Sequence, residues 1–129
     1  MTWFRTWLDD VAPADRPVIL AGFSGGAAFA GGLALNDPAR FSGTAVLFGT
    51  LPFDAGIPVE PGQLGALSVF VAQGDQDHVI PAELLDRTWR YLTEESGARV
   101  VALRTAGGHG LTTSTVSDLG QWIAELLRH

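Results

Sequence analysis

The chain has 129 residues, no cysteine and a formal net charge of −6, with fourteen acidic side chains against eight basic ones. This length is that of a single domain with one hydrophobic core, here residues 1–129. The acidic balance argues against nucleic acid or an anionic membrane as a partner, and the lack of cysteine excludes disulfides and thiolate metal sites. No apolar run reaches membrane-spanning length and residues 1–10 do not resemble a secretory signal, so a soluble, cytoplasmic protein is expected.

An amphipathic helix is predicted first, over residues 3–11, because its apolar residues recur at helical spacing. Short Val- and Leu-rich runs bounded by Gly, Pro or polar residues then predict strands at 17–23, 43–49, 67–74 and 99–107. Further helices are predicted after residue 24, over 81–97 and over 112–128, whereas 49–65 is predicted as a long connection with at most one short helical turn. Strands that alternate with helices indicate a parallel sheet, buried on both faces, in an α/β fold.

The stretch "GFSGG" places Ser24 between the first predicted strand and the helix that follows it. In a G-x-S-x-G turn the serine has a strained backbone and its hydroxyl stands above the sheet edge. Larger side chains would collide at positions 22 and 26, which predicts a need for glycine at both. The helix that begins at Gly25 would direct N–H groups toward an oxyanion formed at Ser24. The alternative is a tight strand-to-helix turn with no chemistry.

Two further side chains are expected at the same edge of the sheet as Ser24. The third predicted strand ends in "GDQDHVIP" and the fourth in "TAGGHG", which supply Asp77 and His109. The chain order Ser, Asp, His is that of α/β-hydrolases. In the alternative, Asp77 caps the next helix and His109 is a surface loop residue. Asp75 is the competing acid and is assigned to the turn. A divalent metal site formed by Asp75, Asp77, His78 and His109 is a further alternative, but the cluster lacks the helical i, i+4 spacing of a hydrolytic zinc site.

The stretches "VILAGFSGGAA", "GDQDHVIP" and "GGHG" resemble the motifs of the phospholipase/carboxylesterase family of α/β-hydrolases, which includes acyl-protein thioesterases. The resemblance implies that Ser24 is the nucleophile, Asp77 the acid and His109 the base. "NDPARFSGTAVLFGTLP" also resembles the family's helix end, next strand and the loop that borders its acyl pocket. Dienelactone hydrolases are a more distant likeness.

The sequence departs from the family pattern in two respects. Members have about four more strands ahead of the nucleophile strand, including the loop that gives a second oxyanion donor, so the resemblance covers only the C-terminal half of the usual fold. Gly25 stands where the family typically has Gln. Since the loss of one oxyanion donor costs on the order of 10²–10³ in turnover, weak catalysis is expected unless the donor comes from elsewhere.

The sequence therefore predicts a minimal, truncated α/β-hydrolase-like fold of about four parallel strands flanked by helices. The predicted function is a serine hydrolase of small-molecule carboxylic esters, thioesters or lysophospholipids, with no cofactor and no metal. Gly25 is the expected oxyanion donor. Apolar side chains near the motif ends either contact the acyl group or belong to the core: Phe23, Phe48, Leu51 and Phe53.

Residues 17–23 would form an apolar sheet edge with unpaired backbone groups, which favours association. Trp3, Phe4 and Trp7 could shield this edge in part; otherwise a homodimer is expected. The alternative function is a catalytically silent remnant of the fold that serves as an interaction or assembly module.

Overall fold

The computed structural model describes residues 2–11, 17–53, 56 and 59–128. Its helices are α1 (Thr2–Val11), α2 (Gly25–Asn36), α3 (Ala82–Arg90) and α4 (Thr113–Leu127), and its strands are β1 (Ile19–Phe23), β2 (Gly43–Leu47), β3 (Ser68–Gly74) and β4 (Arg99–Thr105). A 3₁₀ turn over Pro38–Arg40 follows α2, and a π-helical turn over Tyr91–Glu95 extends α3. All four predicted strands and the predicted helices are present, although the π-helical turn was not anticipated.

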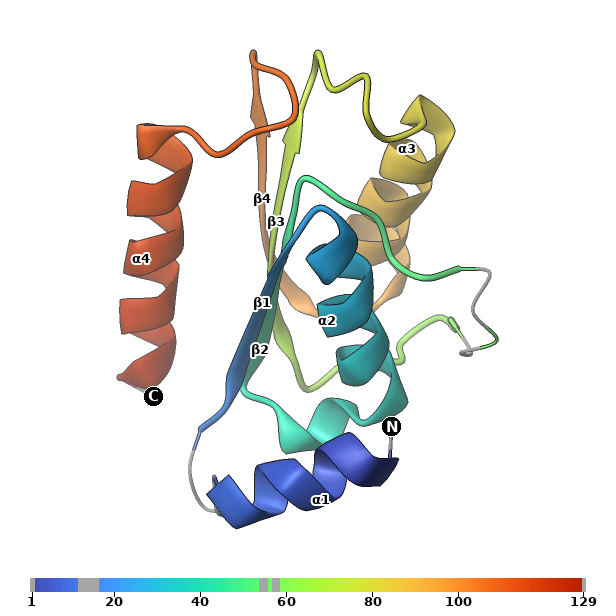
Figure 1. The fold of residues 1–129 in the computed structure, drawn as a ribbon, viewed down its shortest axis with the longest axis vertical. Coiled ribbons are helices and arrows are strands. Elements are labelled where there is room, and N and C mark those ends of the chain that lie inside the picture. The colour runs from blue at the N-terminus through green and yellow to red at the C-terminus, as the bar shows by residue number, and fades with distance from the viewer. Residues whose placement is uncertain (1, 12–16, 54–55, 57–58, 129) are drawn as a thin grey trace.

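The four strands form one parallel sheet in the order β1-β2-β3-β4, so neighbours in the chain are neighbours in the sheet. Helix α4 covers one face of the sheet, while α1, α2 and α3 lie on the opposite side (Figure 1). This arrangement confirms the predicted fold class, which is four parallel strands flanked by helices.

Two hydrophobic clusters fill the space between these layers. The larger one joins side chains of α1, α2 and the π-helical turn to β2 and β3, and includes Leu8, Leu33, Val69 and Leu92. The smaller one packs Trp122 of α4 against Phe48 and Phe70 on the other face of the sheet. The sheet is therefore buried from both sides at its centre.

Burial differs between the central and the outer strands. Every residue of β2 and β3 is buried, whereas every residue of β4 is exposed or half-buried. The expectation that all four strands are buried on both faces is therefore wrong for β4, and also for β1. Both lie at sheet edges, where no further strand covers one side in the described part of the chain.

Some expectations from the sequence concern residues 3–4 and 49–65, which the structure describes only in part. Trp3 and Phe4 belong to α1, but their side chains lie outside the described residues, so their predicted shielding of the β1 edge is untested. The described portions of 49–65 contain turns and neither helix nor strand.

In the described helices, no segment combines the length and apolar character that crossing a bilayer would require.

Candidate active site

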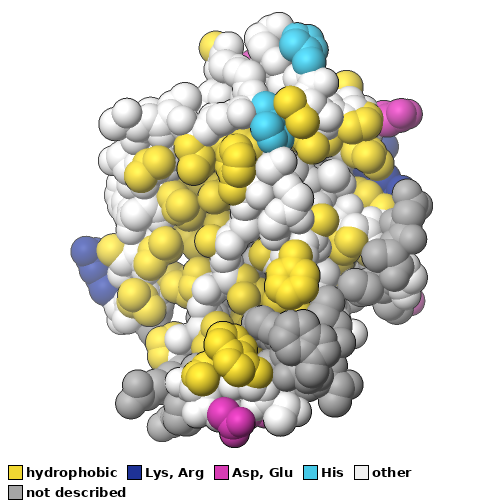
Figure 2. Space-filling model, in the orientation of Figure 1, with side chains coloured by type: hydrophobic (Ala, Val, Ile, Leu, Met, Phe, Trp, Pro, Cys, Tyr) yellow, Lys and Arg dark blue, Asp and Glu magenta, His cyan; other side chains and the backbone are white. Residues whose placement is uncertain are grey.

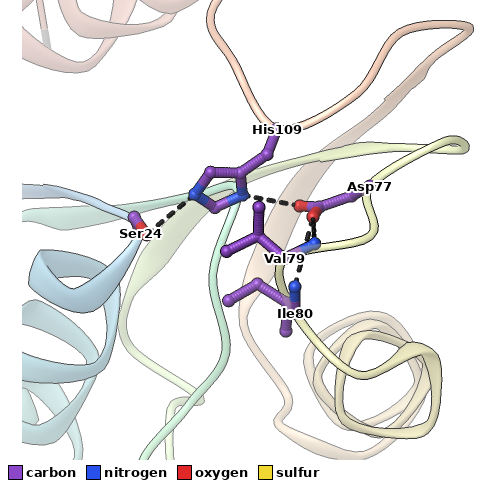
Figure 3. A network of polar contacts seen from close by, with 5 residues as sticks. All are labelled: Ser24, Asp77, Val79, Ile80 and His109. Atoms are coloured by element: carbon purple, nitrogen blue, oxygen red, sulfur yellow. Dashed lines mark hydrogen bonds and ion pairs between the residues drawn. The ribbon is translucent and has the colours of Figure 1, made fainter.

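The carboxyl ends of the parallel strands meet at one edge of the sheet, and three polar side chains gather there. Ser24 directly follows β1, Asp77 follows β3 and His109 follows β4 (Figure 3). The Nε2 atom of His109 lies 2.8 Å from Ser24 Oγ, and its Nδ1 atom lies 2.8 Å from Asp77 Oδ2. The structure thus brings the three predicted residues into one hydrogen-bonded line.

The backbone at Ser24 has φ 56° and ψ −117°, a conformation that non-glycine residues rarely adopt. The Ser24 N–H donates to the Leu47 carbonyl of β2 at 2.9 Å, and the Ser24 carbonyl accepts from Ala27 N–H at 3.0 Å in the first turn of α2. A Cβ at Gly22 would collide with the Gly26 carbonyl, so the turn requires glycine there. These contacts hold the serine in its strained geometry.

The expected need for glycine at position 26 is wrong. A Cβ on Gly26 would meet no atom within 4 Å, because the crowding at the turn comes from the Gly26 carbonyl rather than from its α-carbon. Gly25 opens α2 and is exposed, and a Cβ there would also meet open space. Its N–H belongs to the first turn, where helical N–H groups have no intrahelical acceptor. Gly25 therefore stands where an oxyanion donor at Ser24 would be needed.

The carboxylate of Asp77 is fully buried, and each of its oxygens has its own partners. Oδ2 faces His109, whereas Oδ1 accepts from the backbone N–H groups of Val79 at 2.9 Å and Ile80 at 3.2 Å (Figure 3). Burial raises the pKa of Asp77, but the hydrogen bonds from His109 and from these two N–H groups outweigh it, and the net pKa is below its ordinary value. The carboxylate is therefore held in its charged form.

The other polar candidates lie apart from this line. Asp75 and His78 are exposed, and Asp77 supports its own loop rather than capping α3, whose N-cap is Pro81. Among the residues that the structure describes, no three His, Asp or Glu side chains are placed to hold a metal ion.

The four apolar candidates occupy different environments. Phe23 is 41% exposed, and its ring centroid lies 5.3 Å from that of His109 and 5.9 Å from that of Phe48. Phe48 and Leu51 are buried, while Phe53 is half-buried beneath the Arg87 guanidinium, 3.9 Å from its ring centroid. Of the four, Phe23 alone is exposed at the side of the imidazole.

The sequence analysis did not predict two features of the site. Phe48 has φ 51°, so it and Ser24 are the non-glycine residues with positive φ in the described chain, and both lie at the same sheet edge. No residue pattern signals that strain in a phenylalanine. The N–H groups of Val79 and Ile80 could have been anticipated, since an aspartate commonly accepts from the backbone two residues ahead.

A hollow of about 330 Å³ lies at the other end of the sheet. Its lining includes Ser68 and Arg99 at the starts of β3 and β4, and Trp122 and Leu126 of α4. Ser24, Asp77 and His109 do not line this hollow, so it is separate from the candidate active site.

The family described as Phospholipase/Carboxylesterase matches residues 4–127 of this sequence. Among solved structures, a Bacillus cereus carboxylesterase is similar with a TM-score of 0.78 and 22% identity, over 97% of this chain and 59% of its own. Zea mays acyl-protein thioesterase 2 is similar with a TM-score of 0.74 and 18% identity, over 97% of this chain and 62% of its own. A Mesorhizobium loti carboxylesterase has a TM-score of 0.77 and 21% identity, over 95% of this chain and 58% of its own.

These likenesses show a shared fold, and the chain spans 58–62% of the length of those three proteins. No curated protein matches the sequence.

Proposed function

The chain belongs to the phospholipase/carboxylesterase family, and from that premise we propose that it is a serine hydrolase that cleaves carboxylic esters through an acyl-enzyme. The observation that carries the proposal is the hydrogen-bonded line from Ser24 through His109 to Asp77. Its supports are the strained backbone of Ser24 and the lowered pKa of Asp77.

In the first half of the reaction, Ser24 Oγ attacks the acyl carbonyl carbon while His109 Nε2 takes the hydroxyl proton. Asp77 accepts a hydrogen bond from Nδ1–H, which leaves the Nε2 lone pair directed at Ser24 and stabilises the imidazolium that forms. The Gly25 N–H donates to the oxyanion of the tetrahedral intermediate. Collapse of this intermediate breaks the ester C–O bond, and the imidazolium gives its proton to the departing alcohol.

In the second half, water attacks the acyl-enzyme with His109 again as the base, and the acid is released as Ser24 regains its proton. A protonated imidazole cannot act as this base, so His109 must be neutral when the water attacks. With Gly25 as the only proposed oxyanion donor, turnover should be low.

We propose Phe23 as the wall of the acyl site because it is exposed beside His109. Phe48, whose ring centroid lies 5.9 Å from that of Phe23, would support that wall from the core. Leu51 and Phe53 belong to the larger cluster on the other face of the sheet, so they would border the acyl site only at a distance. The proposed substrate class is a small-molecule acyl ester. Thioesters and lysophospholipids are alternative substrates, and their turnover is to be compared with that of esters in the same assay. A homodimer formed along β1 is part of the same proposal.

Covalent labelling by a fluorophosphonate probe tests the chemistry directly. We expect the protein to be labelled and the Ser24→Ala and His109→Ala variants to lose labelling. Ser117→Ala is the matched control, because Ser117 is an exposed serine of α4 and its loss should leave labelling unchanged.

The other candidate function is a catalytically silent module of the fold that serves in interaction or assembly. That candidate predicts no labelling of a folded protein. Such a result would contradict the hydrolase proposal.

A further inference from the structure

The hollow of about 330 Å³ lies between α4 and the starts of β3 and β4, and its volume is that of a small-molecule site. Side chains alternate between the two faces along a strand, and Phe70 of β3 packs against Trp122 on the α4 face. Ser68, two residues before Phe70, therefore faces α4 as well. Arg99 and Val101 of β4 are the register partners of Ser68 and Phe70, so they share this face.

The hollow differs in charge from the surface on the other side of α4. In Figure 2, hydrophobic side chains gather between α4 and α2, and acidic or basic side chains of the described residues appear only toward the margins of the view. The lining of the hollow comes from β3, β4 and α4, and it combines one arginine and one glutamate with apolar side chains. A ligand of this hollow therefore meets two opposite charges.

These two charged side chains, Arg99 and Glu125, do not pair with each other. The Arg99 Nε–H donates to Ser68 Oγ at 3.3 Å, and among the described residues no carboxylate forms an ion pair with the guanidinium. Glu125 Oε1 accepts from Gln121 Nε2 at 3.2 Å, and no basic group in the described chain forms an ion pair with this carboxylate. Both groups can therefore bind a ligand that lies between them.

The rest of the lining supplies one more donor and an apolar wall. Ser68 is 6% exposed, and because its hydroxyl oxygen accepts from Arg99, its own proton remains available beside the guanidinium. Trp122, Leu126 and Val101 form the apolar part of the lining, and Val101 is 43% exposed. The hollow thus presents two donor groups for an anion, one acceptor for a cation and an apolar surface.

We propose that this hollow binds a free α-amino acid with an apolar side chain, such as leucine. The carboxylate of the amino acid accepts from the Arg99 guanidinium and the Ser68 hydroxyl, and its ammonium donates to Glu125. Its side chain lies against Trp122 and Val101. A simple anion would bring its charge close to Glu125, and a simple cation would bring its charge close to Arg99, so the zwitterion is favoured over either.

The Trp122 indole N–H resonance reports on this site and is assigned by its loss in Trp122→Phe. Titration with leucine should shift this resonance to saturation and raise the Tm, since a ligand that binds only the folded state stabilises it. Isocaproate is leucine without the ammonium, and isoamylamine is leucine without the carboxylate. Each should bind about tenfold more weakly than leucine, because one charged hydrogen-bonding group is lost. Glycerophosphoethanolamine, a zwitterionic lipid headgroup without an apolar side chain, should not bind.

Variants of the two charged residues give the second measurement. Arg99→Gln and Glu125→Gln should each weaken leucine binding about tenfold. Arg90→Gln and Glu83→Gln are the matched controls, because both residues are exposed on α3, on the opposite side of the sheet, and their loss should leave the affinity for leucine unchanged. If the Arg99 and Glu125 variants do not fold, the comparison of leucine with isocaproate and isoamylamine in the parent protein decides.

The inference does not depend on ester hydrolysis, because the triad does not line the hollow. A Trp122 resonance that leucine leaves unmoved in the folded parent protein would overturn it. So would equal affinity for leucine in folded Arg99→Gln and Glu125→Gln. Binding of isocaproate or glycerophosphoethanolamine as tight as that of leucine would assign the hollow to an anion or a lipid headgroup and would also overturn it. Loss of fluorophosphonate labelling would contradict the hydrolase proposal alone.

Discussion

Asp77 uses its two oxygens for two different tasks. Oδ2 orients the imidazole of His109, and Oδ1 fixes the carboxylate through the N–H groups of Val79 and Ile80. In Ser-His-Asp triads, the Asp→Asn change favours the wrong imidazole tautomer and lowers kcat on the order of 10⁴-fold. We expect Asp77→Asn to lower ester turnover by orders of magnitude, measured as kcat in purified, folded protein.

Asp75→Asn is the matched control for that substitution. Asp75 is exposed, and its backbone N–H rather than its carboxylate makes the 2.9 Å bond to the Thr105 carbonyl. Its substitution should leave turnover close to that of the parent protein and act mainly on stability, by roughly 0.5 kcal/mol or less. If instead Asp75→Asn abolished turnover and Asp77→Asn did not, the acid of the triad would be Asp75.

The lowered pKa of Asp77 also makes stability depend on pH. Because the pKa is lower in the folded than in the unfolded protein, the charged carboxylate stabilises the fold fully above its unfolded value of about 3.9. This stabilisation is lost as pH falls through the folded pKa. The difference in Tm between the parent protein and Asp77→Asn should therefore be constant near neutral pH and shrink in acid below about pH 4. A difference that grows in acid would contradict this sign.

At the scale of elements, backbone hydrogen bonds join the loop that carries Asp77 to the loop that carries His109. Asp75 N–H donates to the Thr105 carbonyl at 2.9 Å, and Gln76 N–H donates to the Gly107 carbonyl at 3.0 Å. Gly74, the last residue of β3, makes room for this contact, since a Cβ there would collide with the carbonyls of Gly107 and Gly108.

Gly74→Ala should therefore displace the loop that carries His109. Misplacement of a catalytic group by about 1 Å can cost on the order of 10²-fold in rate, so kcat should fall by about that factor with little change in KM. Gly120→Ala is the control, because a Cβ on Gly120 meets nothing within 4 Å and alanine should stabilise α4 by about 0.5–1 kcal/mol. Unchanged kcat in Gly74→Ala would show that the loops tolerate separation.

The sequence predicts elements well where hydrophobic period and flanking residues agree. The run of residues 67–74 is apolar throughout, and β3 is buried throughout. The left-handed conformation of Gly97, with φ +78°, occurs at the predicted end of the helix over 81–97. Local patterns do not report the position of a strand in the sheet, which is why the exposure of β4 was missed.

At the scale of the whole molecule, the family match confirms the resemblance drawn from three short motifs. The grouping of Ser24, Asp77 and His109 could be predicted because the carboxyl ends of parallel strands meet at one edge. Their hydrogen bonds depend on turn geometry, such as the strained Ser24 and the approach of Gly74 to the His109 loop, which composition does not encode. The homodimer along β1 stays a prediction, because no contact among the described residues tests it.

The order of the sheet has a consequence for how the protein matures. The order of strands β1 to β4 in the sheet is also their order in the chain, so each newly synthesised strand can pair with the strand synthesised just before it. The Ser24 turn is local and can form early, but its hydrogen-bond partner His109 lies 85 residues further along the chain. Chains that stall before β4 docks would contain the serine without its base. The reactivity of Ser24 would then report completion of folding, because it would appear last in a refolding time course.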